Sequence, residues 1–194
     1  MKQVNTSDQR YSDVEDAIIG AFERMTRVKA PEKITVTDII RTAGIVRSTF
    51  YNHYQDIPAL LESYENRTLN EISKMMTGRN LASGAEVCYE YFYEICEYTR
   101  NREYLRRMFR QADATGYIEK ALTMIHVYAQ HVLLAVDPTE QQEKDTSYAI
   151  AYSIGGVVGV LHKWCVLDCR DSSEEIARHL TDLFLHGTQE FIFH

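Results

Sequence analysis

Residues 35–54 read TVTDIIRTAGIVRSTFYNHY. Thr35 and Asp38 form a capping-box pattern, which opens a short helix. Gly44 stands where a left-handed residue ends that helix. A second short helix is expected from about Arg47 to Tyr54. The buried side of the first helix is formed by apolar residues at helical spacing, namely Val36, Ile39, Ile40 and Ala43.

Two short helices joined by a tight glycine turn form a helix-turn-helix, whose second helix lies in the major groove of DNA. Ala43 is small enough for the helices to approach closely, and Ile45 fills the angle between them. Phe50 and Tyr54, four residues apart, are expected to face the core. The outward residues all donate hydrogen bonds: Arg47, Ser48, Thr49, Tyr51, Asn52 and His53. The spacing alone would also fit a chance lookalike.

The residues of this stretch, followed by Leu60 and Leu61, closely resemble the DNA-binding domain of TetR-family regulators over about residues 12–61. The resemblance implies a homodimer that binds a palindromic operator in double-stranded DNA. It also implies a DNA-binding domain over residues 1–57 and an effector-binding and dimerisation domain over 58–194. By position, the family's frequent DNA contacts match Thr35, Thr37, Arg47, Ser48, Thr49, Tyr51, Asn52 and His53.

The chemistry of these side chains suggests different tasks. Arg47 pairs with guanine or with a phosphate alone, and Asn52 suits adenine. Tyr51, His53 and the hydroxyls of Thr35, Thr37 and Thr49 suit phosphates, which position a protein without specifying sequence. Each residue also has a solvent-facing alternative. Thr35 is the most ambiguous, because it is also the helix cap.

Three positions depart from the family pattern. Val46 stands where a capping Ser is usual, which costs the recognition helix about 1 kcal/mol. Ser48 replaces a Gly or another small residue. Ile57 replaces a Lys that often reaches a phosphate, so backbone binding and its salt dependence should be weaker.

The whole chain is expected to be all-α, with about nine helices and no strand of convincing length. Another capping-box pattern, Ser12 to Glu15, places the start of the first helix at Ser12. Asp137-Pro138 and Ser172-Ser173 are expected to open the last two helices. The helices after residue 57 are expected over 58–76, 85–100, 102–111, 115–135, 138–167 and 173–192.

The C-terminal part, 153–164 and 172–176 above all, looks like the last two helices of a TetR-family subgroup, which pair with their mates in a four-helix dimer interface. Glycines in a helix interior are tolerable where another backbone comes close, but close packing within one subunit explains them as well. The expected interface residues are Gly155, Gly156, Gly159, Ile176, Leu180, Leu183 and Phe184.

Most of the thirteen tyrosines lie after residue 60. Aromatic rings with a polar tip suit a pocket for a small-molecule effector, although each ring alone suits an ordinary core equally well. The expected ligand-binding residues are Tyr89, Phe92, Tyr93, Phe109, Tyr128, Tyr152 and Trp164.

Composition bounds the function classes. The net charge is −7, but residues 1–60 are balanced and no acid lies between Asp38 and Asp56, so this segment suits a phosphate backbone. No secretory signal or membrane span is visible, which favours the cytoplasm. No metal spacing, phosphate loop or catalytic order supports a cofactor or an enzyme.

The leading interpretation is therefore a transcriptional regulator, expected to be a repressor whose operator affinity a small effector changes. The alternative is a similar regulator controlled by a protein partner or by thiol oxidation. The four cysteines, Cys88, Cys96, Cys165 and Cys169, contain no CxxC pair and are interpreted as buried apolar residues, with a redox pair or metal site as the alternative.

Overall fold

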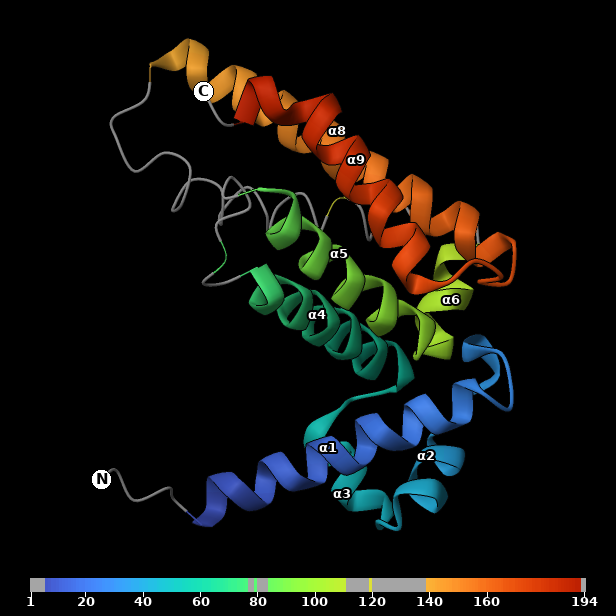
Figure 1. Cartoon of the computed structure of the whole chain (residues 1–194). Helices are drawn as coiled ribbons and strands as arrows, with labels where there is room; N and C mark the ends of the chain where they lie inside the picture. The colour runs from blue at the N-terminus through green and yellow to red at the C-terminus, as the bar shows by residue number, and fades with distance from the viewer. Residues whose placement is uncertain (1–5, 77–78, 80–83, 111–118, 120–138, 193–194) are drawn as a thin grey trace. The chain divides into compact units, whose positions relative to one another are not determined.

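The computed structural model describes residues 6–76, 79, 84–110, 119 and 139–192, and in this part of the chain every regular element is a helix. The all-α prediction is confirmed. The chain divides into two compact units, Met1–Arg67 and Thr68–His194, coloured blue to teal and green to red in Figure 1. The division falls inside helix α4 (Ile57–Met76), and the functional domain boundary after residue 57 stays a prediction.

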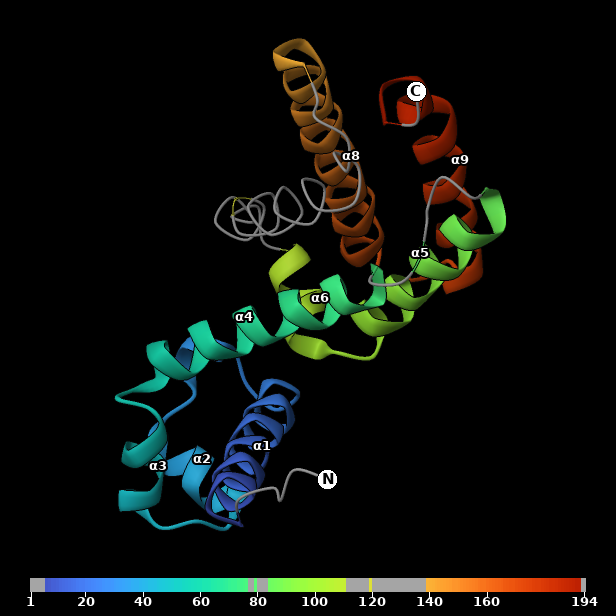
Figure 2. The same cartoon turned by 90° about the vertical axis from the view of Figure 1, so that its left-hand side faces the viewer.

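The first unit contains α1 (Thr6–Thr26), a short 3-10 helix (Pro31–Lys33), α2 (Val36–Ala43), α3 (Arg47–His53) and the beginning of α4. Figure 2 shows α2 and α3 beside α1. Their shared core is apolar and closed to solvent, because each helix contributes one buried face. Its fully buried side chains are Ile18, Ala21, Phe22, Ile39, Phe50 and Leu60.

The start of α1 differs from the prediction. The helix already begins by Thr6, so Ser12 lies inside it and does not cap it. Nothing between residues 6 and 12 breaks a helix, and Gln9 donates a hydrogen bond of 2.8 Å to Asp13 one turn later. A Ser-x-x-Glu pattern is compatible with a helix interior when the preceding residues also favour helix.

The second unit contains α5 (Ala85–Arg100), α6 (Glu103–Arg110), α8 (Glu140–Val166) and α9 (Ser173–Ile192). The last helix packs against both α5 and α8, and α6 packs against α8. Figures 1 and 2 both show α8 and α9 running antiparallel. The core of this unit includes Phe92, Leu105, Leu161, Trp164 and Leu180.

The cap of α8 also differs from the prediction. Thr139, and not Asp137, is the N-cap. Its hydroxyl accepts a hydrogen bond from the backbone N–H of Gln142, and the side-chain oxygen of Gln142 accepts one from the backbone N–H of Thr139. This reciprocal pair satisfies two backbone donors, which a proline start does not achieve. The helix predicted over 115–135 lies outside the described residues. The predicted cap of the last helix is confirmed, since Ser172 accepts from the N–H of Glu175 at 3.2 Å.

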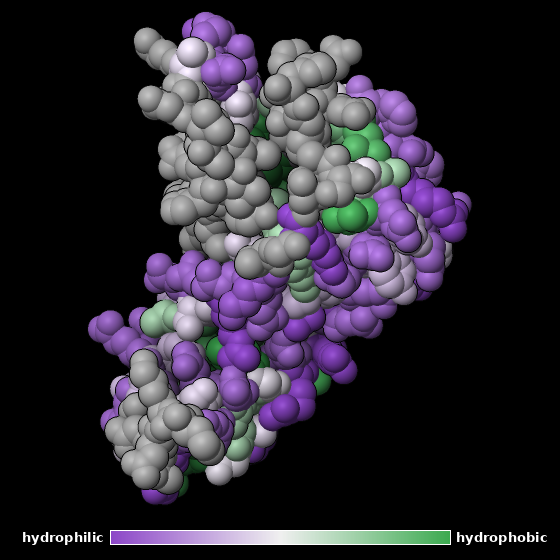
Figure 3. Space-filling view, turned by 60° about the vertical axis from the view of Figure 1, so that its left-hand side comes forward, coloured by the Kyte–Doolittle hydropathy of each residue, from purple (hydrophilic) through white to green (hydrophobic). Residues whose placement is uncertain are grey.

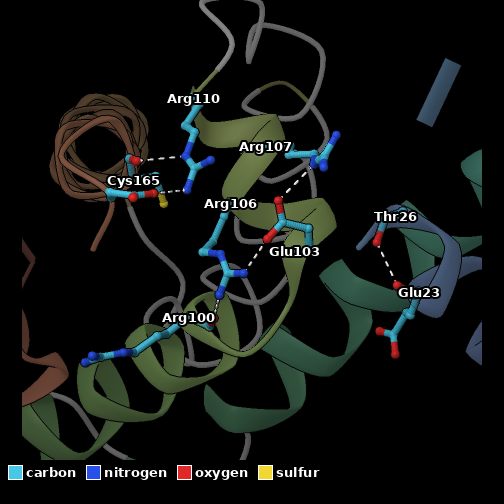
Figure 4. A network of polar contacts seen from close by, with 9 residues as sticks. Glu23, Thr26, Arg100, Glu103, Arg106, Arg107, Arg110 and Cys165 are labelled. Carbon is cyan, nitrogen blue, oxygen red and sulfur yellow. Dashed lines mark hydrogen bonds and ion pairs between the residues drawn. The ribbon is translucent and has the colours of Figure 1, made fainter. Parts of the chain in front are cut away.

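The arginines of α6 bind partners within the second unit, as Figure 4 shows. Glu103 binds Arg106 and, at 2.8 Å, Arg107. Arg110 donates to the carbonyl of Cys165 at 3.0 Å and pairs with Asp168. The Arg110 contacts fasten α6 to the end of α8, whereas the Glu103 pairs lie within α6 itself.

The segment Lys144–Val166 is long and apolar enough to cross a membrane by composition alone. Within the unit it is a packed helix, because one of its faces contributes Ile150, Ile154, Leu161 and Trp164 to the core. A core helix of a globular protein has this composition too.

Candidate DNA-binding surface

The first turn of α2 is fixed by the predicted capping box. The Thr35 hydroxyl accepts from the Asp38 N–H at 3.3 Å, and the Asp38 carboxylate accepts from the Thr35 N–H at 2.9 Å. Lys29 also binds this carboxylate. The hydrogen bonds from Lys29 and Thr35 hold the pKa of Asp38 well below its ordinary value. An ionised Asp38 therefore locks the start of the helix.

The turn between α2 and α3 is made by Gly44, as predicted. Its φ of 70° and ψ of 31° lie in the left-handed region, where a side chain is disfavoured. The Ile45 N–H then bonds the Ile40 carbonyl at 3.1 Å, which closes the end of α2 in a Schellman-type arrangement. The chain consequently turns sharply into α3.

The inner side of α3 is anchored by the two predicted residues, Phe50 and Tyr54, which are 0% and 6% exposed. The Tyr54 hydroxyl lies 3.1 Å from Glu15 on α1 and 3.4 Å from Ser63 on α4. Burial raises the pKa of Tyr54 to about 12. The phenol therefore stays neutral and donates to the Glu15 carboxylate, which fixes α3 to its neighbours.

The outer side of α3 exposes Arg47, Ser48, Tyr51 and Asn52, while Thr49 and His53 are half-buried. Arg47 donates to the Tyr51 hydroxyl at 3.1 Å and lies 5.5 Å from the centre of that ring. The two side chains therefore stand together on one face. Thr35 and Thr37 are also exposed, at the start of α2. The six predicted contacts of α3 thus lie on one short helix, with the two threonines on the helix before it.

His53 is the one predicted contact that is also tied to α1. Its ring stacks on Tyr11, with centroids 4.0 Å apart and an interplanar angle of 27°. Its Nδ1 is buried and has no hydrogen-bond partner among the described residues. Sequence reasoning missed Tyr11, because it placed the start of the first helix at Ser12.

The predicted departures from the family pattern are visible at both ends of α3. Val46 takes the N-cap position with extended backbone and provides no side-chain hydrogen bond. Ile57 opens α4 and is half-buried. The N-terminus of α4 is capped by the preceding Asp56, which accepts from the Ala59 N–H at 2.8 Å.

The predicted ligand-binding residues are distributed over different environments. Phe92, Phe109 and Trp164 are core residues, and the indole N–H of Trp164 donates to the Asp171 carbonyl at 3.1 Å. Tyr89 and Tyr93 stack on each other on the half-exposed side of α5. Tyr152 is 65% exposed on α8. Tyr128 lies outside the described residues, and an effector pocket stays a prediction.

The predicted interface residues divide into two groups. Gly155, Gly156 and Gly159 are exposed on α8, and a Cβ at any of them would meet nothing within 4 Å. Close packing within the described part of the subunit therefore does not explain them. Leu183 is 60% exposed. Ile176 and Leu180 are instead buried in the subunit's own core, while Phe184 packs on Phe92 with ring centroids 5.7 Å apart.

The thiols fit the interpretation as buried apolar residues. All four are free and buried. Burial raises the pKa of Cys88 to about 11 and that of Cys96 and Cys165 to about 12. Protonated thiols are poor nucleophiles, so this environment disfavours control by thiol oxidation. No group of residues suited to hold a metal ion occurs in the described part of the chain.

A capped α2, a left-handed glycine turn and an anchored α3 with a polar outer face together define a helix-turn-helix protein. The family model TetR_C_8, described as a transcriptional regulator C-terminal region, matches residues 86–186. The chain belongs to the TetR family of transcriptional regulators. The predicted family is thereby confirmed, and the regulator interpretation holds over the enzyme interpretation.

Solved structures agree on the fold. A TetR-family regulator from Streptomyces coelicolor is 13% identical, with a TM-score of 0.68 over 93% of this chain and 85% of that one. The dihydroxyacetone kinase operon activator DhaS is 16% identical, with a TM-score of 0.63 over 92% and 98%. The TetR-family repressor AlkX from Dietzia is 12% identical, with a TM-score of 0.60 over 91% and 98%. No curated protein matches the chain in sequence.

Proposed function

We propose that the protein binds a palindromic operator as a homodimer, with α3 of each subunit in the major groove of one half-site. The observation that carries this proposal is the outer face of α3, where only hydrogen-bonding side chains project from a helix held by Phe50 and Tyr54. A rigid helix with a polar face suits base reading, because the position of each donor is set before DNA arrives.

The contacts divide by chemistry. Asn52 is exposed and forms the bidentate pair with adenine that its amide allows. Arg47 reads guanine or holds a phosphate, and its bond to Tyr51 directs the guanidinium along the same face. Tyr51, His53 and the threonines at 35, 37 and 49 donate to phosphates and set the register on the duplex. Ser48 lies on the same exposed face and completes it.

Dimerisation through α8 and α9 is supported by the exposed residues of these helices. Tyr148, Tyr152 and Leu183 are 67%, 65% and 60% exposed, and the exposed glycines of α8 leave room for a partner backbone. Figure 3 shows patches of apolar surface, in green, surrounded by the mostly hydrophilic surface of the second unit. A second subunit would remove such apolar surface from water.

Repression is the proposed outcome, because a dimer that covers an operator blocks a promoter without any further contact. Solved structures of this fold include both a repressor and an activator, so a reporter assay decides between the two. A small effector is proposed to favour one spacing of the two recognition helices and the operator another, and this coupling is reciprocal. A cytoplasmic location is proposed as well, because a transcriptional regulator acts where the DNA is.

Selection of bound duplexes from a random pool tests the proposal. The expected consensus is palindromic, with half-sites about one helical turn apart. The selected operator, placed over a reporter promoter, should lower expression when the protein is present. An asymmetric consensus would contradict the dimeric docking, and raised expression would contradict repression. A metabolite screen by thermal shift, followed by operator titration with each stabilising compound, tests the effector.

A further inference from the structure

The two turns of α1 that precede Ser12 extend the helix along the end of α3. Tyr11 lies on this extension, is 52% exposed, and stacks on the His53 ring. Glu15, one turn further along α1, binds Tyr54, the residue that follows α3. Residues four apart share a helix face. One face of α1 therefore holds two consecutive residues at the end of α3.

The burial of Nδ1 indicates which nitrogen of His53 carries the proton. Nδ1 is closed to solvent and has no hydrogen-bond partner among the described residues, whereas the ring as a whole is half-buried. A buried N–H donor without an acceptor is rare and costly. The neutral imidazole carries one proton on either nitrogen. The proton therefore belongs on Nε2.

This tautomer matters for a phosphate contact. A phosphate oxygen only accepts hydrogen bonds, so a neutral imidazole binds it only through a nitrogen that carries a proton. If the ring turned over, its N–H would face the protein and its lone pair would face the phosphate. The orientation of the ring thus decides whether His53 attracts DNA.

We propose that Tyr11 is a positioning residue for DNA binding, which stacks on His53 and holds it as the Nε2–H tautomer so that Nε2–H donates to an operator phosphate. The inference rests on the proposed role of α3 in DNA binding. Tyr54, whose ring centroid lies 6.3 Å from that of His53, limits the ring from the α3 side. Tyr11 contacts the His53 ring from α1, so that the ring lies between Tyr11 and Tyr54.

Two substitutions separate stacking from the other properties of Tyr11. Tyr11→Phe keeps the ring and removes the hydroxyl. Tyr11→Leu keeps apolar bulk and helix propensity but has no aromatic plane. Nitrogen-15 NMR of the full-length protein without DNA reports the tautomer of His53 directly. The wild type and Tyr11→Phe should show protonated Nε2 and bare Nδ1, whereas Tyr11→Leu should show a mixture.

DNA binding gives the second readout. Tyr11→Leu should weaken binding by up to about tenfold, which is the effect of losing a hydrogen bond to a charged group completely, and equally on operator and scrambled duplexes. Tyr11→Phe should bind within about twofold of the wild type, because its ring stacks in the same way. In the His53→Ala background, Tyr11→Leu should have no further effect, because the two residues act as one unit.

The failures are distinguishable. An unchanged His53 tautomer in Tyr11→Leu overturns the positioning role, whatever DNA does. Equal losses in Tyr11→Phe and Tyr11→Leu mean that the hydroxyl contacts DNA directly, which also overturns it, as does full additivity with His53→Ala. A tautomer change combined with no effect of His53→Ala on binding instead removes His53 from the proposed DNA contacts. The circular dichroism of each variant controls for folding.

Discussion

The Tyr54 hydroxyl donates a hydrogen bond of 3.1 Å to the Glu15 carboxylate and so joins the end of α3 to α1. The ring of Tyr54 is 6% exposed, and the same hydroxyl lies 3.4 Å from Ser63 on α4. Three helices of the first unit therefore meet at one phenol. A helix as short as α3 is marginal by itself, so contacts with neighbouring helices such as this one hold it in place.

Tyr54→Phe should lower the free energy of unfolding by about 1–2 kcal/mol, because it leaves the part-buried Glu15 without its donor. Burial raises the pKa of Tyr54 from 10 to about 12. The unfolded chain ionises first, so this residue's contribution is complete below pH 10 and is lost as the pH rises through 12. Urea titrations between pH 7 and 11.5 should show a smaller alkaline loss in the variant. Parallel losses in both proteins would contradict the assignment.

Asp38 predicts the opposite pH dependence. Bonds from Lys29 and Thr35 hold its pKa below the ordinary value of 3.8, so its contribution is present above that value and is lost as the pH falls through the lowered pKa. Asp38→Asn should cost about 1 kcal/mol near neutral pH. The difference from the wild type should shrink in acid. A difference that stays constant from pH 6 to pH 2.5 would be inconsistent with a paired carboxylate.

The uncapped start of α3 should be improvable. Val46 is 65% exposed and already has the extended backbone of an N-cap. Val46→Ser should therefore stabilise the protein by about 0.5–1 kcal/mol, because its hydroxyl accepts from a free N–H of the first turn. Val46→Ala is the matched control and should not stabilise. Thermal unfolding measures both, and an equal gain in the two variants would exclude capping as the cause.

Dimerisation should depend on the exposed face of α8 and α9. Gly156→Arg has open space within the subunit, so it should fold normally and produce monomers by blocking the partner. Leu183→Glu should do the same by placing a charge in the interface. Val28→Glu, at a residue 75% exposed in the first unit, is the control and should remain dimeric. Light scattering after gel filtration decides, and dimeric Gly156→Arg would place the interface elsewhere.

Much of the fold could be predicted because the residues that start and end a helix are close together in the sequence. Gly44 and the Thr35–Asp38 box fixed α2 and its turn, and the predicted bounds of α5, residues 85–100, agree with those observed. Local patterns also misled. The Ser12–Glu15 box lies inside α1, and the Thr139–Gln142 box caps α8 in place of the predicted Asp137-Pro138 start. A capping-box pattern does not show whether the helix has already begun at an earlier residue.

What covers an apolar face could not be predicted. Periodicity places Ile176, Leu180 and Leu183 on α9, but only packing against α5 and α8 shows that the first two are buried and the third is exposed. The stack of Tyr11 on His53 joins residues far apart in the chain. Such contacts arise from tertiary geometry, which a single sequence does not display.

Binding of Asn52→Ala to the selected operator, compared with a scrambled duplex of equal length, tests most directly whether α3 reads sequence. The variant should lose about 1–3 kcal/mol on the operator and little on the scrambled duplex, because a neutral amide contributes little to phosphate attraction. Asn70→Ala, at an exposed residue of α4, should bind both duplexes like the wild type. Operator binding by Asn52→Ala and Arg47→Ala at wild-type strength, with helicity and dimerisation intact, would show that this face of α3 is not the DNA-reading surface.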